Sequence, residues 1–132
     1  MCIRDSVRFA SDLLNVLSGD VSLALNRLAI GQASAENAKL GRLVLERGRR
    51  VVGLQARALL EGGRRRNFLR YDDPDAAFRT LYGLITCDFH VRMLLGDALD
   101  AREQEFDAHA RCAIEQFFQL HGTDIGPFPN PT

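Results

Sequence analysis

The stretch YDDPDAAFRTLYGLITCDFHVRMLLG, residues 71–96, decides the fold of this chain. Asp73 is a good helix N-cap, and Pro74 suits the first helical position, where its missing N–H costs nothing. Apolar residues then occupy most of the helix circumference as far as Gly96, which can end the helix. A helix that is apolar all round must be buried on several sides. The stretch therefore predicts a long buried helix over residues 74–95, with one side available to a second subunit.

Apolar residues recur at helical spacing on both sides of this stretch. Capping residues and helix breakers divide the pattern into further segments. We expect helices over residues 8–17, after Asp20, from Ser34 to a break at Gly48, from Arg49 toward a left-handed Asn67, and over residues 103–121. No segment shows the alternation that is typical of a strand. The sequence thus predicts an all-α domain of about six helices.

The composition is that of an ordinary globular domain. The chain has 132 residues, which is one domain and long enough to bury a core. The apolar fraction is 46% and the charged fraction 26%, and no apolar run approaches the length of a membrane span. Three cysteines do not make a disulfide framework, so the sequence predicts a cytoplasmic protein that does not act at a membrane.

The net charge of zero hides an uneven distribution. Residues 42–70 contain nine Arg and two acidic residues, whereas residues 71–132 contain eleven acidic residues and four Arg. A basic segment can contact phosphate groups. No nucleic-acid recognition motif accompanies this one, so we interpret these Arg as solvated helix faces and helix ends.

The two ends of the chain differ from its middle. The opening MCIRDS has no helical or strand periodicity, and no apolar stretch follows that would make it a secretory signal. It resembles the translated end of a transposase sequencing adapter, in which case the natural gene continues upstream of Val7. We therefore expect residues 1–6 to be an adapter-derived leader, residues 7–122 to form the domain, and residues 123–132, rich in Pro and Gly, to be a flexible tail.

Cysteine and histidine residues recur three positions apart on the last two predicted helices. If these helices form an antiparallel hairpin, Cys87, His90, His109 and Cys112 would lie at similar heights, as a tetrahedral zinc site requires. The commoner interpretation is a small apolar cysteine and a hydrogen-bonded histidine. A nucleophilic Cys112–His109 pair lacks an orienting partner. Because the sequence also lacks a phosphate loop and the GxSxG and HExxH motifs, we predict no enzyme, no cofactor and no metal site.

Three segments resemble a known family of regulators. DDPDAAFRTLYGLITCDFHVRMLLG and FDAHARCAIEQFFQLHG, which start at residues 72 and 106, are similar to the C-terminal regulatory domain of TetR/AcrR-family transcriptional regulators of the AefR-like subgroup. RLAIGQA, residues 27–33, resembles that family's R-L-(V/I)-I-x-E-A segment, with Gln32 in place of the usual Glu. The family's FPEL turn is replaced by SAEN at residues 34–37.

The resemblance implies a function. Such regulators join an N-terminal helix-turn-helix domain, which binds operator DNA, to a C-terminal domain that binds a small apolar or amphipathic ligand. The C-terminal domains dimerise through their last two long helices, here residues 74–95 and 103–121, which would form a dimerisation hairpin. No helix-turn-helix follows Val7. We therefore expect a homodimeric, ligand-binding domain that binds operator DNA only through a missing N-terminal domain.

Apolar character and relative position give candidate site residues. A ligand pocket between the first four helices and the inner face of the 74–95 helix would be lined by Leu25, Leu28, Gln32, Phe78, Tyr82 and Phe89. The dimer face would contain Leu84, Val91, Ala110, Ile114, Phe117 and Phe118. An ordinary core position is the alternative for each pocket residue. A helical dimerisation module without a ligand, or a Cys/His metal-binding protein, are the alternative functions.

Overall fold

The computed structural model describes residues 3–34 and 38–128, and the part of the chain that it describes is mainly helical, with no strand. This confirms the predicted all-α class. The elements in chain order are α1 (Ile3–Ser18), α2 (Asp20–Gln32), α3 (Lys39–Val44), the π-helical turn η1 (Leu45–Arg49), α4 (Arg50–Arg65), α5 (Pro74–Thr86), α6 (Phe89–Leu94) and α7 (Phe106–His121).

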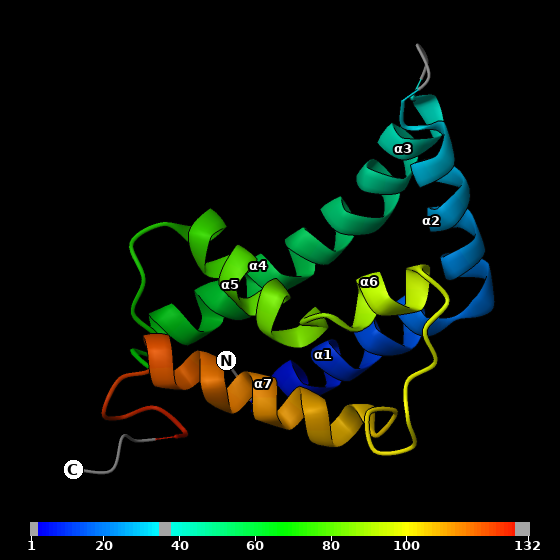
Figure 1. Cartoon of the computed structure of the whole chain (residues 1–132). Helices are drawn as coiled ribbons and strands as arrows, with labels where there is room; N and C mark the ends of the chain where they lie inside the picture. Colours follow the sequence, from blue (N-terminus) through cyan, green and yellow to red (C-terminus); the bar gives the residue numbers. More distant parts are fainter. Residues whose placement is uncertain (1–2, 35–37, 129–132) are drawn as a thin grey trace.

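The helices form two regions, which we call the body and the arm (Figure 1). The body consists of α1, α4, α5, α6 and α7. Within it, α7 lies against both α1 and α5. The arm consists of α2, α3 and η1; α2 and α3 meet at the far end and diverge toward the body (Figure 1). The largest fully buried side chains all belong to the body: Leu14, Leu60, Leu81, Ile85, Ile114, Phe117 and Phe118.

The first difference from the sequence prediction is a join. We expected a break at Gly48, but α3, η1 and α4 follow one another without interruption. Val44, Arg49 and Arg50 all keep right-handed helical backbone angles. A glycine inside a helix weakens it without breaking it, and here the wider π turn absorbs the irregularity. The chain therefore has one long rod that links the arm to the body.

The second difference is a break. The predicted start of α5 is confirmed, since the Asp73 side chain accepts a hydrogen bond from the Asp75 N–H and Pro74 follows. The expected single helix over residues 74–95 is wrong, because it ends at Thr86 and restarts at Phe89. Cys87 lies between them at φ 38° and ψ −125°, a conformation that non-glycine residues rarely adopt.

The restart changes the direction of the last two turns of the predicted helix and the side chains that they bury. After the break, α6 runs in a new direction and buries Phe89 and Met93. The helix ends where the sequence predicted, at Gly96 with φ 87°, and the earlier prediction of a left-handed Asn67 is likewise confirmed at φ 61°. Short-range signals of this kind depend only on the backbone conformation of the residue itself.

The segment before α7 forms a separate turn, which is why α7 begins three residues later than predicted. The Asp100 N–H donates to Glu103 Oε1 (3.1 Å) and the Glu103 N–H donates to Asp100 Oδ1 (2.8 Å). Arg92 of α6 pairs with Glu103 and, at 2.7 Å, with Asp97. The turn is thereby fixed to the end of α6.

The described part of the predicted flexible tail is held against the body. The Thr123 N–H donates to the Phe68 carbonyl at 3.0 Å, and the Phe128 ring lies 5.6 Å from the Phe118 ring, centroid to centroid. A side chain at Gly122 would collide with the Phe118 carbonyl, so glycine is required where the chain leaves α7. Residues of the 123–128 segment of the predicted tail thus contact the body, and residues 129–132 lie outside the described part.

The start of α1 and the absence of a membrane-spanning stretch were also predicted from the sequence. The helix predicted over residues 8–17 starts earlier, at Ile3, and Ser6 of the expected leader is buried within it. Among the described residues no single helix is long and apolar enough to cross a membrane; only α1 and α2 taken together, bent by 66°, match in length and composition.

Candidate functional site

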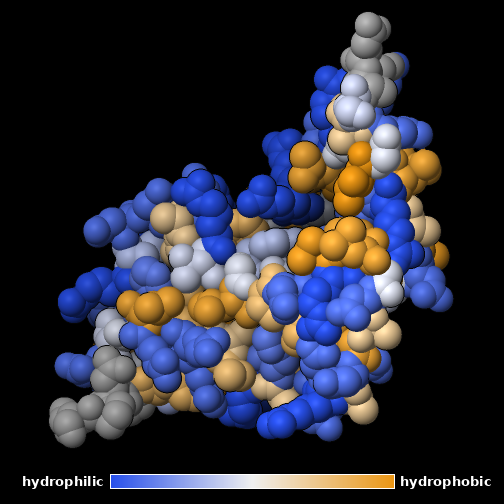
Figure 2. All heavy atoms as spheres, viewed as in Figure 1, coloured by the Kyte–Doolittle hydropathy of each residue, from blue (hydrophilic) through white to orange (hydrophobic). Residues whose placement is uncertain are grey.

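A cavity of about 770 Å³ lies between the arm and the body. This volume falls within the range of about 300–1,000 Å³ that is usual for small-molecule sites. Figure 2 shows apolar side chains over α6 and over the part of the arm that faces it. The apolar wall residues come from five elements: Leu13, Val16, Leu17, Val21, Leu25, Leu40, Leu43, Val44, Leu45 and Val52.

Polar side chains also line this cavity, and we call three of them its polar end: Arg49, Tyr82 and His90. The Arg49 guanidinium lies over the Tyr82 ring, 5.9 Å from its centroid. His90 Nε2 is buried and has no hydrogen-bond partner among the described residues. The cavity therefore combines an apolar wall with one buried polar atom, His90 Nε2, that no described residue pairs.

Burial sets the charge of the two titratable rings in the polar end. It lowers the pKa of His90 below its ordinary value, because a buried imidazolium loses solvation. It raises the pKa of Tyr82, and the nearby positive charge of Arg49 opposes that shift only in part. Near pH 7 the imidazole and the phenol are thus both neutral, and Arg49 supplies the positive charge.

Two irregular backbone segments position the polar end. The restart after Cys87 gives α6 its own direction, and His90 lies in its first turn. The π-helical turn η1 carries Arg49 at its end. A regular helix through either segment would rotate these side chains away from their present positions, since each residue turns a helix by about 100°. Short π segments occur often at functional sites.

One side chain of the arm is hydrogen-bonded to the body outside the lining of the cavity. Arg27 of α2 donates from Nε to the Leu94 carbonyl (2.9 Å) and from Nη2 to the Met93 carbonyl (2.7 Å). Both carbonyls belong to the C-terminal turn of α6, where positive charge is favoured. This contact therefore links α2 of the arm to the C-terminal end of α6.

Two of the six predicted ligand-binding residues line the cavity, namely Leu25 and Tyr82. Leu28 and Gln32 are exposed on α2 outside its lining. Phe78 lines a shallower hollow between α4 and α5. Phe89 is buried against His109, with ring centroids 4.6 Å apart. These four residues therefore lie outside the lining of the cavity, because helix direction rather than apolar character decides which side chains reach it.

Sequence reasoning missed Arg49 and His90 as cavity residues. His90 was considered only as a metal ligand, and Arg49 only as a solvated basic residue. The sequence contains one usable signal, which is that both residues interrupt otherwise apolar helical faces. Their convergence depends on the break at Cys87 and on the π turn, which the sequence does not show.

The predicted dimer face needs a correction as well. Ala110, Ile114, Phe117 and Phe118 have no exposed surface within a single chain, because α1 and α5 cover this side of α7. They are core residues of the body and have no surface with which to contact a second chain. Leu84 is half-buried and Val91 is 54% exposed, so these two remain available.

The Cys/His group that the sequence suggested does not assemble. Cys87 Sγ lies 3.9 Å from His109 Nε2, but that nitrogen also lies 2.8 Å from the Ile85 carbonyl oxygen. Cys112 is exposed, and His90 faces the cavity instead. Within residues 3–34 and 38–128 no three His, Cys, Asp or Glu side chains are grouped so that they could hold a metal ion.

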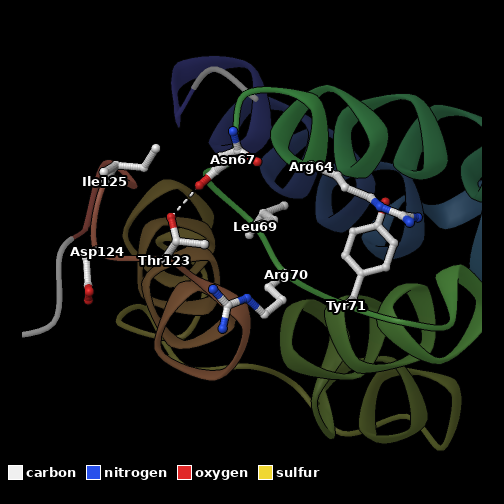
Figure 3. Close-up of a pocket in the computed structure, with 8 residues that line it drawn as sticks. All are labelled: Arg64, Asn67, Leu69, Arg70, Tyr71, Thr123, Asp124 and Ile125. Carbon is white, nitrogen blue, oxygen red and sulfur yellow. Dashed lines mark hydrogen bonds between the residues drawn. The ribbon is translucent and has the colours of Figure 1, made fainter.

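A second hollow, of about 580 Å³, lies between the end of α4 and the C-terminal segment (Figure 3). It contains another stacked pair, with the Arg64 guanidinium 5.4 Å from the centroid of the Tyr71 ring. The Thr123 hydroxyl donates to the Asn67 carbonyl across it (Figure 3). Its polar groups join the C-terminal segment to the α4–α5 connection, so we interpret this hollow as a structural contact.

Comparison with known proteins identifies the family of this domain. The family model for the AefR-like transcriptional repressor, C-terminal domain, matches residues 7–123. A crystal structure of a TetR transcriptional regulator from Agrobacterium tumefaciens is similar to the chain, with 56% identity and a TM-score of 0.84. That match covers 92% of this chain and 58% of the other.

A second solved structure shares the fold. It is assigned to the TetR family, comes from Mesorhizobium loti, and has 22% identity and a TM-score of 0.79 over 93% of this chain and 60% of its own. The chain thus spans about three-fifths of the length of the solved structures that it matches. A comparison with curated proteins gave no match.

Proposed function

Because the chain belongs to the TetR regulators through its AefR-like C-terminal domain, we propose that it is the ligand-binding and dimerising part of a transcriptional regulator. The observation that carries the proposal is the cavity between arm and body. Its walls are mainly apolar, its volume suits a small molecule, and its lining includes a buried polar atom, His90 Nε2, without a partner among the described residues.

Dimerisation is the second part of the proposal. The exposed apolar side chains of α6 and the C-terminal half of α7 would form the contact, since the inward side of α7 is already covered. Val91 and Leu95 on or beside α6, and Leu120 on α7, are each more than half exposed. Apolar surface of this kind is typical of an interface. Leu84 of α5 would lie at its margin.

Operator DNA would be bound by a further domain of the full-length regulator, and the protein would act in the cytoplasm, where that DNA is. A ligand that changes the distance between arm and body would change the spacing of two DNA-binding domains in the dimer. A coupling free energy of about 1–3 kcal/mol is enough for such a switch. The relatives are regulators rather than enzymes, and we propose no catalytic activity for this chain.

Binding of a neutral, solvatochromic dye such as Nile red tests the ligand part. Leu25→Trp should fill the cavity and weaken dye binding at least about tenfold, as overfilling a site does. Leu28→Trp on the same helix is the matched control, because Leu28 is exposed and does not line the cavity. If both variants bind the dye with the same affinity as the unchanged chain, the cavity is not a ligand site. A dimerisation module without a ligand then becomes the better interpretation.

Sedimentation velocity tests the dimer part. We expect a dimer at micromolar concentration, and Val91→Glu should shift it toward monomer because a buried, unpaired charge opposes association. A chain that is monomeric at that concentration would contradict the dimer proposal.

A further inference from the structure

The polar end of the cavity contains hydrogen-bond donors that the protein does not use. Among the described residues, His90 Nε2 has no partner, the Tyr82 hydroxyl makes no hydrogen bond and Arg49 pairs with no carboxylate. Buried polar groups in folded proteins are nearly always hydrogen-bonded. The buried His90 Nε2, together with the Tyr82 hydroxyl and the Arg49 guanidinium that also line this cavity, therefore indicates where a ligand places its polar atoms.

The chemistry of these groups restricts what the ligand can present. The Tyr82 hydroxyl and the Arg49 guanidinium donate, and a neutral imidazole with its proton on Nε2 donates as well. The only formal charge among the three is the positive charge of Arg49. A ligand cation would meet donors and a like charge, whereas a carboxylate would accept from all three, and hydrogen bonds to a charged acceptor are the stronger ones.

The rest of the cavity lining is consistent with a negative head group on a long apolar body. A second guanidinium, that of Arg47, lines the cavity beside one acidic residue, Asp20. The walls beyond the polar end are mainly leucine and valine from α1, α2 and α3. A polar molecule that lacked an apolar part would leave this surface in contact with water.

We propose that the ligand is an amphipathic carboxylic acid, whose carboxylate is held by Arg49, Tyr82 and His90 while its apolar body lies along the leucine-rich wall. This inference rests on the proposed ligand-binding function and adds the chemical class of the ligand. The second hollow offers an internal comparison, because its Arg64–Tyr71 pair has nearly the same stacked geometry without an apolar cavity.

Three probes of equal chain length test the head group: decanoate, decanol and decylamine. Each displaces Nile red from the purified chain if it enters the cavity. We expect decanoate to bind about tenfold more tightly than decanol, the ratio that one charge-assisted hydrogen-bond set supplies, and decylamine to bind most weakly.

Variants of the two stacked pairs test the residues. Arg49→Gln and Tyr82→Phe should each reduce the preference for decanoate over decanol to about threefold or less, mainly by weakening the binding of decanoate. Arg64→Gln and Tyr71→Phe are matched controls that change the same residue types outside the cavity. They should keep the full preference.

The outcomes separate this inference from the function on which it rests. If decanol or decylamine displaces the dye as well as decanoate does, the cavity binds ligands but the carboxylate is wrong. The carboxylate site is also wrong if the control variants lose the preference, because net charge alone would then explain it. If neither the dye nor any probe binds, the ligand-binding function itself is contradicted, and this inference with it.

Discussion

The body and the arm of this domain bury their apolar side chains to very different extents. Around α7, Phe117 and Phe118 have no exposed surface. On the arm, Val21 is 82% exposed and Leu43 45% exposed, although both line the cavity. The body thus has a fully packed core, whereas the arm has an apolar face that is largely exposed. Stability should therefore depend on the body and ligand binding on the arm.

The largest expected effect is on stability, from truncation in the body. Phe117→Ala should lower the free energy of unfolding by about 3–5 kcal/mol, because it leaves a cavity in a fully packed core. Leu43→Ala on the arm is the counterpart and should lower it by less than about 1 kcal/mol, since half of that side chain is already exposed. Urea unfolding measures both. Equal losses would contradict the division into a packed body and an unfilled arm.

A smaller effect is expected from the hydrogen bonds of Arg27, which join the two regions. Arg27→Gln removes the charged donor to the Met93 and Leu94 carbonyls and should reduce local stability by about 1 kcal/mol. Hydrogen exchange should accelerate in α2 and α6 while the amides of α7 keep their protection. If α7 loses protection equally, the arm is not a separate unit and the comparison fails.

These predictions depend on features that the sequence reveals only in part. Helix starts and ends such as Pro74, Asn67 and Gly96 were predicted correctly, because each acts through its own backbone conformation. If the continuous rod of α3, η1 and α4 is counted as one helix, the described residues form six helices, as predicted, but the agreement results from two errors that cancel. The expected break at Gly48 is absent, and an unexpected break stands at Cys87. Both are decided by which side chains pack across the fold, which periodicity does not record.

The candidate site was less predictable than the fold. An apolar stripe on a helix shows which face is buried but not what covers it, so Ile114 and Phe117 were assigned to a second chain when α1 covers them. Similarly, Leu25 and Leu28 look equivalent in the sequence, and only Leu25 reaches the cavity. Residues with matching character become distinguishable only when the direction of each helix is known.

The pH dependence of stability offers a test confined to the body side of α6. The paired guanidinium of Arg92 lowers the pKa of Glu103 to about 2, through hydrogen bonds to its carboxylate. A lowered pKa in the folded state means that the carboxylate stabilises the fold above its ordinary pKa of 4.5 and loses this contribution as the pH falls toward 2.

Glu103→Gln should therefore make the chain less stable at pH 6 and no less stable than the unchanged chain near pH 2. Urea unfolding at pH 6, 4 and 2.5 measures the convergence. The Arg92 and Glu103 side chains are still 28% and 26% exposed, so solvent screens the pair and the difference at pH 6 should be small. A constant difference at all three pH values would mean that the substitution acts through packing rather than through the charge.

The smallest expected effect distinguishes a binding group from a structural one. Tyr82→Phe removes a hydroxyl that has no hydrogen-bond partner in the described residues, so without a ligand the free energy of unfolding should change by less than about 0.5 kcal/mol. With saturating decanoate, the unchanged chain should gain thermal stability that the variant gains only in part, because ligand binding stabilises the folded state in proportion to its affinity. A large loss of unfolding free energy without ligand would mean that the Tyr82 hydroxyl stabilises the fold. The polar end would then be a structural part of the core of the body rather than a binding group.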